Sequence, residues 1–275
     1  MKRVLVTGLN SFVGNAFYEY INNNYKGIYN IERVSLKNND IKKLDLKEYN
    51  AILHVAGIAH SDYGKISEDK VKIYYDINTN LTFSLAKKAK EDGVKQFVFM
   101  SSIIVYGNSA PIGQKKVIEK ETIPCPNNAY GDSKLKAEEK LKLLNSDDFV
   151  VSIIRAPMIY GNNSRGNYNT LKKIALKASF FPYIDNERSV ISINNLCKII
   201  KLIIDNEKSG IYFPQDNDYM NTSKMVERIA SENNKQIVLL NGFASILKFC
   251  SLFTPMINKA FGNLVYDKNL QFKEF

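Results

Sequence analysis

Short apolar runs alternate with longer helical patterns over the first 155 residues, and this alternation constrains the fold of the chain more than any other feature. The runs are nearly continuous in Val, Ile and Phe, which is typical of parallel strands covered on both faces. Helical stretches between such strands provide the crossovers that parallel pairing needs. The sequence therefore predicts an α/β fold with a doubly wound parallel sheet. Its strands are expected at residues 3–6, 31–36, 41–46, 51–55, 96–100 and 149–155, and its helices at residues 11–24, 67–91 and 130–144.

The composition of the chain changes near residue 160. Residues 161–169 are polar and rich in Gly and Asn, which predicts a loop. Short helices, an isolated strand at residues 211–213 and a C-terminal helix pair are expected after it. We therefore expect a first domain over residues 1–160 and a smaller α/β domain over residues 161–275, with interleaved segments. The smaller domain is expected to cover the carboxyl edge of the sheet, where open α/β sheets bind ligands.

Chain length and cysteine content argue against covalent or metal cross-links. A chain of 275 residues with 45% hydrophobic residues can bury a large core without disulfides or metal ions. Cys125, Cys197 and Cys250 are odd in number and match neither a disulfide framework nor a zinc-binding spacing. We expect no metal site, and we expect the protein in a reducing compartment, the cytoplasm.

The chain is basic, with 38 Lys and Arg against 28 Asp and Glu, a formal net charge of +10 at pH 7. Such an excess can serve polyanionic partners such as nucleic acids, membranes or phosphate-bearing ligands, or it can be spread over a solvated surface. The second interpretation is favoured because no run of five basic residues occurs. Because no nucleic-acid-binding motif accompanies the charge either, we expect no nucleic-acid partner.

Two apolar stretches bear on membrane contact. The N-terminal apolar run ends at Thr7, too early for a signal peptide, and no window of about 18 apolar residues predicts an integral membrane segment. Residues 244–260 are markedly apolar, and we expect them to pack in the core or an interface of the smaller domain. Contact with a membrane surface is the alternative, although Pro255 would interrupt a long amphipathic helix.

Residues 7–14, which read TGLNSFVG, follow the first expected strand and open the first expected helix. Gly8 permits a tight turn there, and Gly14 permits close packing of the helix on the sheet. Ser11 stands where a dinucleotide fingerprint has its middle glycine, and it is still small enough for backbone approach. The free N–H groups and positive dipole of a helix N-terminus suit a pyrophosphate. The motif predicts a dinucleotide site in a Rossmann-type domain.

Three further side chains suit proton transfer at an alcohol or ketone. Tyr130 and Lys134 are four residues apart and share one helix face. An ammonium beside a phenol stabilises the phenolate and lowers the phenol pKa. The phenol then acts as a general acid or base. Ser102 follows a buried strand and emerges at the carboxyl edge of the sheet, where its hydroxyl could hydrogen-bond a substrate carbonyl.

Taken together, these motifs resemble the extended short-chain dehydrogenase/reductase superfamily in its NAD-dependent epimerase/dehydratase branch. The resemblance covers essentially the whole chain. Further matching pieces are HVAG at residues 54–57, Asn78, RAPMIYG at residues 155–161 and RSVISI at residues 188–193. Several local strings look closest to reductases of polysaccharide gene clusters that act on UDP-4-keto-6-deoxy-N-acetylhexosamines, and to UDP-hexose 4-epimerases.

The resemblance implies roles for individual residues. Ser102, Tyr130 and Lys134 would be catalytic, and Ser102, Asn167 and Arg188 would hold the UDP-sugar substrate. A planar guanidinium suits a diphosphate because it pairs with phosphate oxygens. The cofactor would be bound by Gly8, Asn10, Ser11, Phe12, Val13, Gly14, Lys37, Asp45, Leu46, Ala56, Gly57, Asn78, Tyr130, Lys134 and Pro157. Family members usually dimerise through the helices expected at residues 67–91 and 130–144, so we expect a homodimer.

The end of the second expected strand departs from the pattern of NAD-preferring members, which carry an acid there for the ribose hydroxyls. The sequence has Ser35 and Lys37 instead, and Lys37 would attract a 2′-phosphate. We therefore favour NADP(H) over NAD(H). Glu32 lies close enough to reverse this preference if the strand starts earlier.

Three reactions share this constellation: 4-epimerisation, 4,6-dehydration and 4-keto reduction. Dehydratases usually carry an Asp-Glu pair after the catalytic Thr, where this chain has Ile103 and Ile104, so dehydration is disfavoured. These apolar residues suit a C6 methyl group better than a hydroxymethyl group. Met158 also stands where many 4-epimerases have an Asn. The sequence favours an NAD(P)H-dependent 4-keto reductase of cell-surface polysaccharide sugar biosynthesis, with a 4-epimerase as the alternative.

Overall fold

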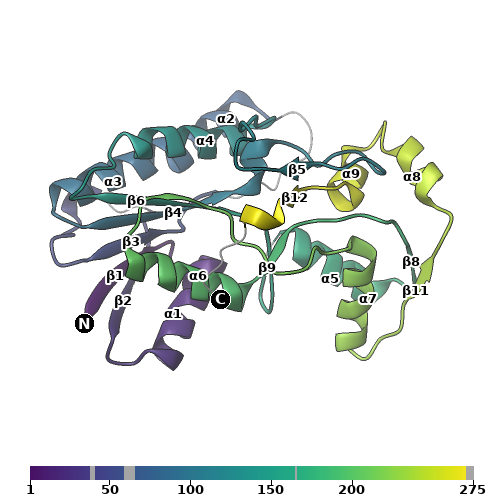
Figure 1. Ribbon diagram of the computed structural model, residues 1–275, viewed down its shortest axis with the longest axis horizontal. Coiled ribbons are helices and arrows are strands. Elements are labelled where there is room, and N and C mark those ends of the chain that lie inside the picture. The colour runs from purple at the N-terminus through teal and green to yellow at the C-terminus, as the bar shows by residue number, and fades with distance from the viewer. Residues whose placement is uncertain (38–40, 59–65, 165, 271–275) are drawn as a thin grey trace. The chain divides into compact units, whose positions relative to one another are not determined.

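Six strands form one sheet in the order β10-β6-β4-β3-β1-β2, and every pairing in it is parallel. The computed structural model describes residues 1–37, 41–58, 66–164 and 166–270 (Figure 1). The strands are β1 (Lys2–Thr7), β2 (Tyr29–Val34), β3 (Ala51–His54), β4 (Gln96–Ser102), β6 (Val150–Ala156) and β10 (Gly210–Tyr212). The predicted doubly wound parallel sheet is confirmed.

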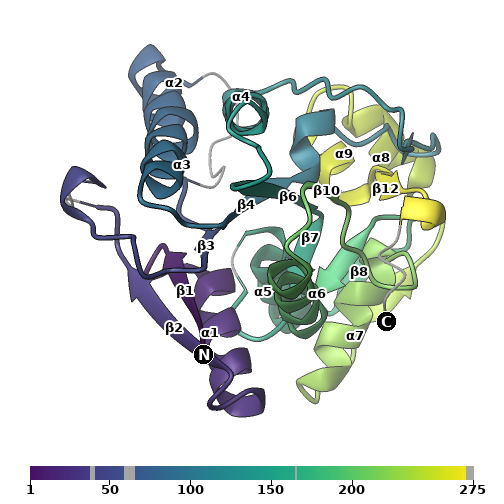
Figure 2. The same cartoon turned by 60° about the vertical axis from the view of Figure 1, so that its left-hand side comes forward.

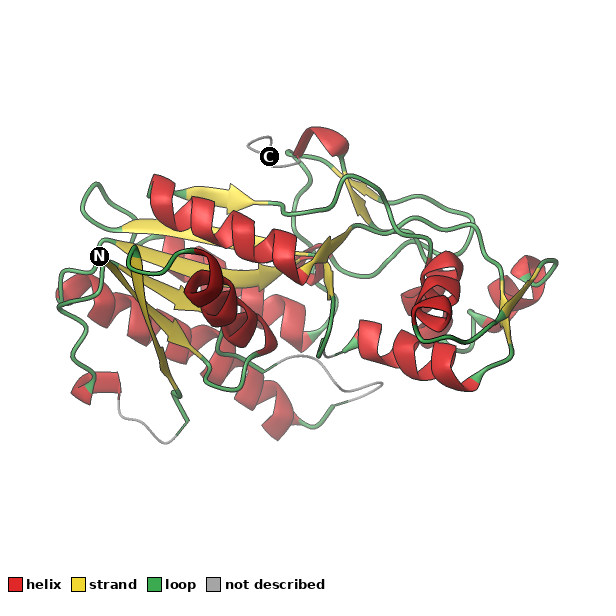
Figure 3. Ribbon diagram, turned by 90° about the horizontal axis from the view of Figure 1, so that it is seen from below, coloured by secondary structure: helices red, strands yellow, loops and turns green. Residues whose placement is uncertain are grey.

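Helices cover both faces of this sheet. On one face lie α1 (Phe12–Asn24) and α6 (Ile193–Asn206), and on the other lie α2 (Glu68–Tyr74), α3 (Thr82–Glu91) and α4 (Ala129–Lys142) (Figures 1 and 2). Figure 3 shows the strands side by side with helices in front of and behind them. Because both faces are covered, the residues of the inner strands β1, β3, β4 and β6 are buried almost without interruption, as their Val, Ile and Phe content predicts.

The strand expected at residues 41–46 is wrong. The structure has a short 3-10 helix there, η1 (Ile41–Lys43). Ile41 and Leu44 both pack against the hydrophobic core, and a spacing of three residues suits a 3-10 turn rather than a strand. With no strand beyond β2, the strand order reverses between β1 and β3. The carboxyl ends of these two strands therefore form the topological switch point, where open α/β sheets bind nucleotides.

The predicted helix at residues 67–91 is helical throughout but changes pitch. Between α2 and α3 lies a π-helical segment, η2 (Tyr75–Leu81), which contains Asn78. Wider π turns appear most often at functional sites, since they redirect one or two side chains. Thr79 of this segment donates from Oγ1 to the carbonyl of Ser133 in α4 at 2.7 Å. The segment is therefore fastened to α4 at the turn that follows Tyr130.

The chain divides into two compact units that exchange segments. Unit 1 comprises Met1–Gly107, Pro124–Ala156 and Ile193–Pro214, and unit 2 comprises Asn108–Ile123, Pro157–Ser192 and Gln215–Phe275. The strand expected to be isolated at residues 211–213 is β10, which instead pairs with β6 in the large sheet. Residues 193–214, beyond the boundary expected near residue 160, thus belong to unit 1, and residues 108–123, before it, belong to unit 2.

Unit 2 is built on small sheets and its own core. Parallel pairs form between β5 (Val117–Ile118) and β12 (Val265–Tyr266), β7 (Met158–Tyr160) and β9 (Val190–Ser192), and β8 (Phe180–Pro182) and β11 (Val238–Leu240). Its helices are α5 (Asn167–Lys177), α7 (Thr222–Glu232), α8 (Ala244–Cys250) and α9 (Pro255–Phe261). In the part of the chain that the structure describes, no helix is both long and apolar enough to cross a bilayer.

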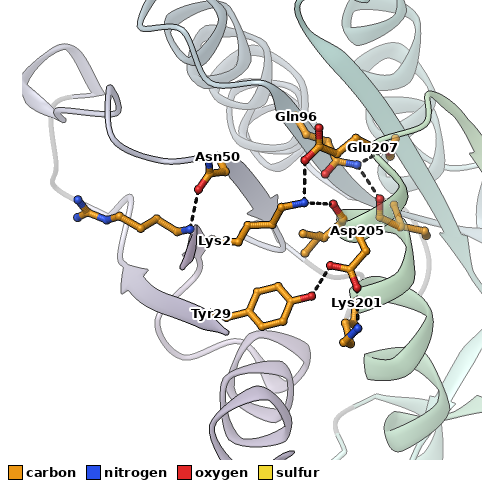
Figure 4. Close-up of polar contacts among 11 residues, drawn as sticks. Lys2, Tyr29, Asn50, Gln96, Lys201, Asp205 and Glu207 are labelled. Carbon is orange, nitrogen blue, oxygen red and sulfur yellow. Dashed lines mark hydrogen bonds and ion pairs between the residues drawn. The ribbon is translucent and has the colours of Figure 1, made fainter. Parts of the chain in front are cut away.

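Polar contacts at the amino edge of the sheet anchor α6 to the sheet of unit 1 (Figure 4). The Lys2 ammonium donates to a carbonyl at the end of α6 at 2.8 Å and to Glu207 at 2.7 Å. The Tyr29 hydroxyl donates to Asp205, which also accepts from Lys201 at 2.6 Å. These contacts lie at the opposite end of the strands from the switch point, so they hold the scaffold and leave the carboxyl edge open to ligands.

A buried ion pair fixes α4 against the sheet. Glu138 of α4 and Arg155 of β6 are 0% and 4% exposed, with a shortest N–O distance of 2.6 Å. Glu138 also accepts from the hydroxyl of Ser101 at 2.5 Å, and Arg155 donates to the Tyr106 hydroxyl at 2.5 Å. Tyr106 ends the short helix η3 (Ile103–Tyr106) that follows β4. The carboxylate therefore joins α4 to two central strands.

Replacing Glu138 by Ala is expected to lower the free energy of unfolding by about 3–5 kcal/mol, because it leaves the Arg155 guanidinium buried and unpaired. The matched control is Glu139→Ala, since Glu139 is the next residue of α4 and is exposed. That change should stay within about 0.5 kcal/mol. Urea unfolding followed by circular dichroism measures both, and equal losses in the two variants would contradict the prediction.

Candidate active site

Two turns meet at the switch point between β1 and β3. Gly8 follows β1 with a φ of +87°, a conformation that favours glycine. A Cβ on Gly8 would lie 3.1 Å from the backbone N and Cα of Ala56, which follows β3. The turn after β1 therefore packs directly against the backbone of the turn after β3. Together the two turns form the floor of a candidate nucleotide site.

The N-terminus of α1 opens directly above this floor. Ser11 caps the helix by accepting the N–H of Gly14 at 3.2 Å. A Cβ on Gly14 would lie 3.1 Å from side-chain atoms of both Val55 and Val6, so glycine allows the helix to approach the sheet. Val13 is buried, whereas Asn10 is exposed. The helix thus presents its first N–H groups next to the Gly8 turn, an arrangement suited to an anion.

A buried histidine joins the ends of β1 and β3. His54 Nδ1 lies 2.8 Å from the hydroxyl of Thr7, and its Nε2 lies 2.9 Å from that of Thr82. Burial, together with the nearby Lys134 charge, lowers the pKa of His54 to about 3, so the ring is neutral at physiological pH. The Thr7 hydroxyl also accepts the N–H of Ala56 at 3.3 Å. His54 is therefore a structural link beneath the Gly8 floor.

Gly57, Asn78 and Lys134 come together beside the switch point. A Cβ on Gly57 would lie 2.9 Å from Asn78 Oδ1 and 3.3 Å from Lys134 Nζ. Asn78 is fully buried in η2, where it accepts the N–H of Ile58 at 2.9 Å and donates to the Ser133 hydroxyl at 3.1 Å. Three residues assigned to the cofactor from the sequence thus share one place, and glycine at position 57 lets the amide and the ammonium pack closely against its backbone.

Tyr130 lies in the first turn of α4, and its ring is 6.2 Å from that of Tyr74. Burial raises the pKa of Tyr130 to about 12, the hydrogen bond with Ser102 lowers it, and the Tyr74 hydroxyl raises it. The structure therefore brings Ser102 and Tyr130 together across β4 and α4, as the sequence predicts. At neutral pH the phenol is protonated and able to donate.

Lys134 is almost fully buried one turn after Tyr130. Its ammonium donates to the carbonyl of Met100 at 2.9 Å and lies 4.6 Å from the centre of the Phe99 ring. Burial lowers the pKa of Lys134 to about 8, and the Glu138 carboxylate partly opposes this effect. Burial, Ser102 and Tyr74 shift the Tyr130 pKa here, and the expectation that Lys134 lowers it stays a prediction.

Of the described residues at the end of β2, from Arg33 to Lys37, none is a carboxylate and two are cations. The strand ends at Val34, so Glu32 lies inside it, and its carboxylate is held by Arg3 at 2.9 Å and Tyr49 at 2.7 Å. Lys37 is exposed just beyond the strand. Arg33 reaches towards α1, where it donates to Asn15 at 2.8 Å, and it had no place in the sequence-based site. The observed register leaves Glu32 away from the carboxyl edge.

Asp45 and Leu46, which were assigned to the cofactor from the sequence, differ in their surroundings. Asp45 is exposed after η1, and its carboxylate accepts the N–H of Lys47 at 3.2 Å. Leu46 is 0% exposed and belongs to the hydrophobic core of unit 1. The side chain of Leu46 is thus occupied by packing, whereas Asp45 is accessible.

The residues expected to bind the substrate diphosphate lie in unit 2. Asn167 is exposed at the start of α5. Arg188 uses Nη1 for the hydroxyl of Ser109 at 3.2 Å and for the carbonyls of Lys259 and Gly262 at 2.9 and 3.0 Å. Burial lowers the pKa of Arg188 to about 10. Among the residues that the structure describes, no carboxylate pairs with Arg188, so its charge is available to an anionic ligand.

Pro157 and Met158, both named in the sequence analysis, begin a chain segment of unit 2. Pro157 directly follows β6 and is the first residue of its segment of unit 2. Met158 begins β7. This strand pairs with β9, which begins at Val190, two residues after Arg188.

Several residues that build the site were given no role of their own in the sequence analysis. Glu138 stands four residues after Lys134, so helical spacing alone could have placed its charge on the same face. Arg155 was quoted only as part of a matching string, and nothing local reveals that it meets Glu138. Ser133 and His54 contribute through contacts between distant segments, which a sequence pattern does not report.

Comparison with known proteins gives both relatives and a family. At the sequence level the chain is 34% identical to a UDP-glucose 4-epimerase of Vibrio cholerae over 194 residues, 68% of this chain and 58% of that protein. It is 31% identical over 172 residues, 60% of this chain, to N-acetyl-alpha-D-glucosaminyl-diphospho-ditrans,octacis-undecaprenol 4-epimerase of Escherichia coli O157:H7, half of whose length is matched. The matches thus span little more than half of these relatives.

Solved structures of similar fold include a dTDP-4-dehydrorhamnose reductase of Bacillus anthracis in complex with NADP, with a TM-score of 0.70 and 19% identity over 97% of this chain and 91% of that one. MoeE5 in complex with UDP-glucose and NAD has a TM-score of 0.70 and 18% identity over 96% and 88%. The family model described as the NAD dependent epimerase/dehydratase family matches residues 4–212. With the Gly8 turn, the capped α1 and the Ser102–Tyr130 pair in place, this chain belongs to the NAD-dependent epimerase/dehydratase family.

Proposed function

We propose that this chain is an NADPH-dependent reductase that converts the C4 ketone of a UDP-linked 4-keto-6-deoxy-N-acetylhexosamine into an alcohol, in the synthesis of cell-surface polysaccharide. The observation that carries the proposal is the end of β2, where Lys37 is exposed and the described residues from Arg33 to Lys37 include no carboxylate. Arg33 adds a second cation near the start of α1. Cations at this position favour the 2′-phosphate of NADP(H) over the free ribose of NAD(H).

The residues present fit a dinucleotide. The Gly8 turn has no side chain to keep a pyrophosphate from its backbone, the α1 N-terminus supplies N–H groups, and Asn78 and Lys134 lie together against Gly57. A bound nicotinamide dinucleotide would supply the hydride for C4. Unit 1 is accordingly proposed as the cofactor-binding unit.

The chemistry of the remaining residues suits reduction of a ketone. The Tyr130 hydroxyl, protonated because burial raises its pKa to about 12, delivers a proton to the carbonyl oxygen as hydride reaches the carbon. When substrate binds, the Ser102 hydroxyl donates to that oxygen instead of to Tyr130, so that Ser102 and Tyr130 both act as donors to the negative charge that develops. Lys134 provides a positive charge one turn along α4. Ile103 next to Ser102 offers an apolar contact for a C6 methyl group.

Unit 2 is proposed as the nucleotide-sugar-binding unit. Arg188 is held by backbone carbonyls rather than by an acid, so its fixed guanidinium can pair with a diphosphate. Asn167 lies exposed at the first turn of α5, where helix N–H groups also favour anions. A UDP-sugar carries such a diphosphate.

A 4-epimerase is the second candidate function. It is favoured by the two curated relatives, both named as 4-epimerases. An epimerase oxidises and then reduces the same sugar and so needs no net supply of reductant, whereas a reductase consumes it.

The reductase proposal predicts that the purified protein oxidises one NADPH per 4-keto sugar, with a dissociation constant for NADPH at least about tenfold below that for NADH, because a charge-assisted pair to the 2′-phosphate contributes that much. Absorbance of the reduced cofactor measures both quantities. Turnover of UDP-glucose or UDP-N-acetylglucosamine without added reductant would reject the reductase and support the epimerase.

The Lys37→Glu variant isolates the cofactor preference. It should weaken NADPH about tenfold or more and leave NADH nearly unchanged, and Lys47→Glu, which makes the same charge change at another exposed lysine, should affect neither.

Replacing Tyr130 by Phe should lower kcat by about 10²–10⁴-fold, because it removes the general acid, while NADPH still binds with near-normal affinity. Tyr75→Phe is the control, since Tyr75 also faces α4, where its hydroxyl contacts Asp132. Steady-state kinetics and a fluorescence titration of NADPH provide the two readouts. Near-normal turnover in the Tyr130 variant would remove this residue from its role.

The pH dependence of kcat/KM should show an alkaline limb near pH 8. Lys134 is charged below its lowered pKa of about 8 and neutral above it, so its positive charge is lost as pH rises. Because the Glu138 carboxylate raises this pKa, Glu138→Gln should move the limb to lower pH in the fraction that folds. A limb that stays in place in Glu138→Gln would show that Lys134 is not the group that titrates.

A further inference from the structure

The segment of unit 2 around α8 turns large apolar side chains outward. Leu252 and Phe253 are 76% and 74% exposed, and Phe249 and Ile246 are 64% and 58% exposed. Together with Phe243 and Met256 these residues form what we call the α8 surface. Residues 244–260 were expected to pack in the core or an interface of the smaller domain, and this outward half does not belong to the core.

The same segment also has an inward face. Leu247 of α8 and Ile257 of α9 pack against the hydrophobic core of unit 2. The segment is therefore already anchored in the fold, and the outward residues are not needed to hold it. Phe249 and Phe253 touch each other instead, with ring centres 5.5 Å apart. An apolar cluster of this kind on an exposed surface usually marks an interaction site.

The charge of the surrounding sequence indicates what the α8 surface meets. Residues 233–266 contain no Asp and no Glu, while Lys235, Lys248 and Lys259 lie among them. Lys248 is exposed within α8 itself. Aromatic and aliphatic residues beside lysines, without acids, are typical of segments that lie in the interface of an anionic bilayer.

We propose that the α8 surface docks unit 2 onto an anionic phospholipid bilayer. Phe249, Phe253 and Leu252 enter the boundary between headgroups and acyl chains, and Lys248 contacts the headgroup phosphates. A second copy of the chain is a poorer occupant, because pairing this surface with itself would bring two acid-free basic segments together. The bilayer supplies both an apolar layer and the negative charge that the segment lacks.

This surface is suited to peripheral attachment only. The helix α8 covers Ala244–Cys250, a single short helix, and Pro255 begins the next one. Attachment of this kind depends on the apolar contact and the charge together, so removing either should release the protein. The proposal is independent of the reaction assigned above, because it concerns binding to lipid and not turnover.

Flotation of the full-length protein with vesicles tests the proposal. Binding is expected to vesicles of phosphatidylglycerol and phosphatidylcholine, and not to phosphatidylcholine alone. The double variant Phe249→Ser, Phe253→Ser should bind at least about tenfold more weakly, because two exposed rings no longer enter the bilayer. The control Ile123→Ser, Leu143→Ser changes two equally exposed apolar residues elsewhere and should bind as the natural chain does.

A charge variant separates specific contact from general attraction. Lys248→Glu should weaken binding by about fivefold or more, while Lys47→Glu, with the same net charge, should have little effect. Because the chain contains no Trp, Phe249→Trp gives a single fluorophore whose emission should shift to shorter wavelength on addition of the anionic vesicles. Leu143→Trp should not shift.

Three outcomes would overturn the proposal. The first is no binding of the natural chain to anionic vesicles, and the second is equal binding by the natural chain and the double serine variant. The third is a dimer in sedimentation velocity that the double serine variant dissociates while vesicles bind neither protein, which would make the α8 surface a contact between copies of the chain.

Discussion

The buried pair of Glu138 and Arg155 is the interaction on which the arrangement of unit 1 depends. A carboxylate without solvent access is tolerated only when cations and hydrogen-bond donors surround it, and here the guanidinium, the Ser101 hydroxyl and the nearby Lys134 ammonium do so. Because Arg155 and Ser101 come from two different strands, β6 and β4, α4 has one orientation in which both are satisfied. That orientation sets where Tyr130 and Lys134 stand relative to β4.

Much of unit 1 could be predicted from the sequence because its signals are local. Apolar runs gave the strands, and the TGLNSFVG motif located the turn and the helix that follows it. The register of β2 could not be predicted from local signals, because it depends on how β2 pairs with β1. In the structure Glu32 pairs with Leu5, two residues before the end of β1, so it does not reach the carboxyl edge. The prediction of a strand at residues 41–46 was wrong because the local signal is ambiguous. A short strand and a 3-10 turn can bury the same few apolar residues, so the apolar pattern does not distinguish them.

The candidate site shows the same division between local and distant information. Helical spacing placed Tyr130 and Lys134 on one face, but it could not reveal that Lys134 donates to Met100 of β4. The structure also shows where the Lys and Arg side chains lie. Lys37, Arg33 and Arg188 are the cations that we propose for phosphate groups, and Lys248 accompanies the α8 surface. Most of the positive charge remains on the solvated exterior, where it gives no information about a partner.

The interleaving of the two units has a consequence for how the chain is made. Unit 1 needs β10 and α6, which are synthesised only after two segments of unit 2 have left the ribosome. Until Tyr212 is available, β6 is an open sheet edge, and exposed edges pair readily with other chains. The nascent protein must therefore hold an unfinished sheet while the segment at residues 157–192 emerges. Unit 1 therefore cannot complete its fold strictly in the order in which the chain is synthesised. Before β10 pairs with β6, the nascent chain is most prone to aggregation and most dependent on chaperones.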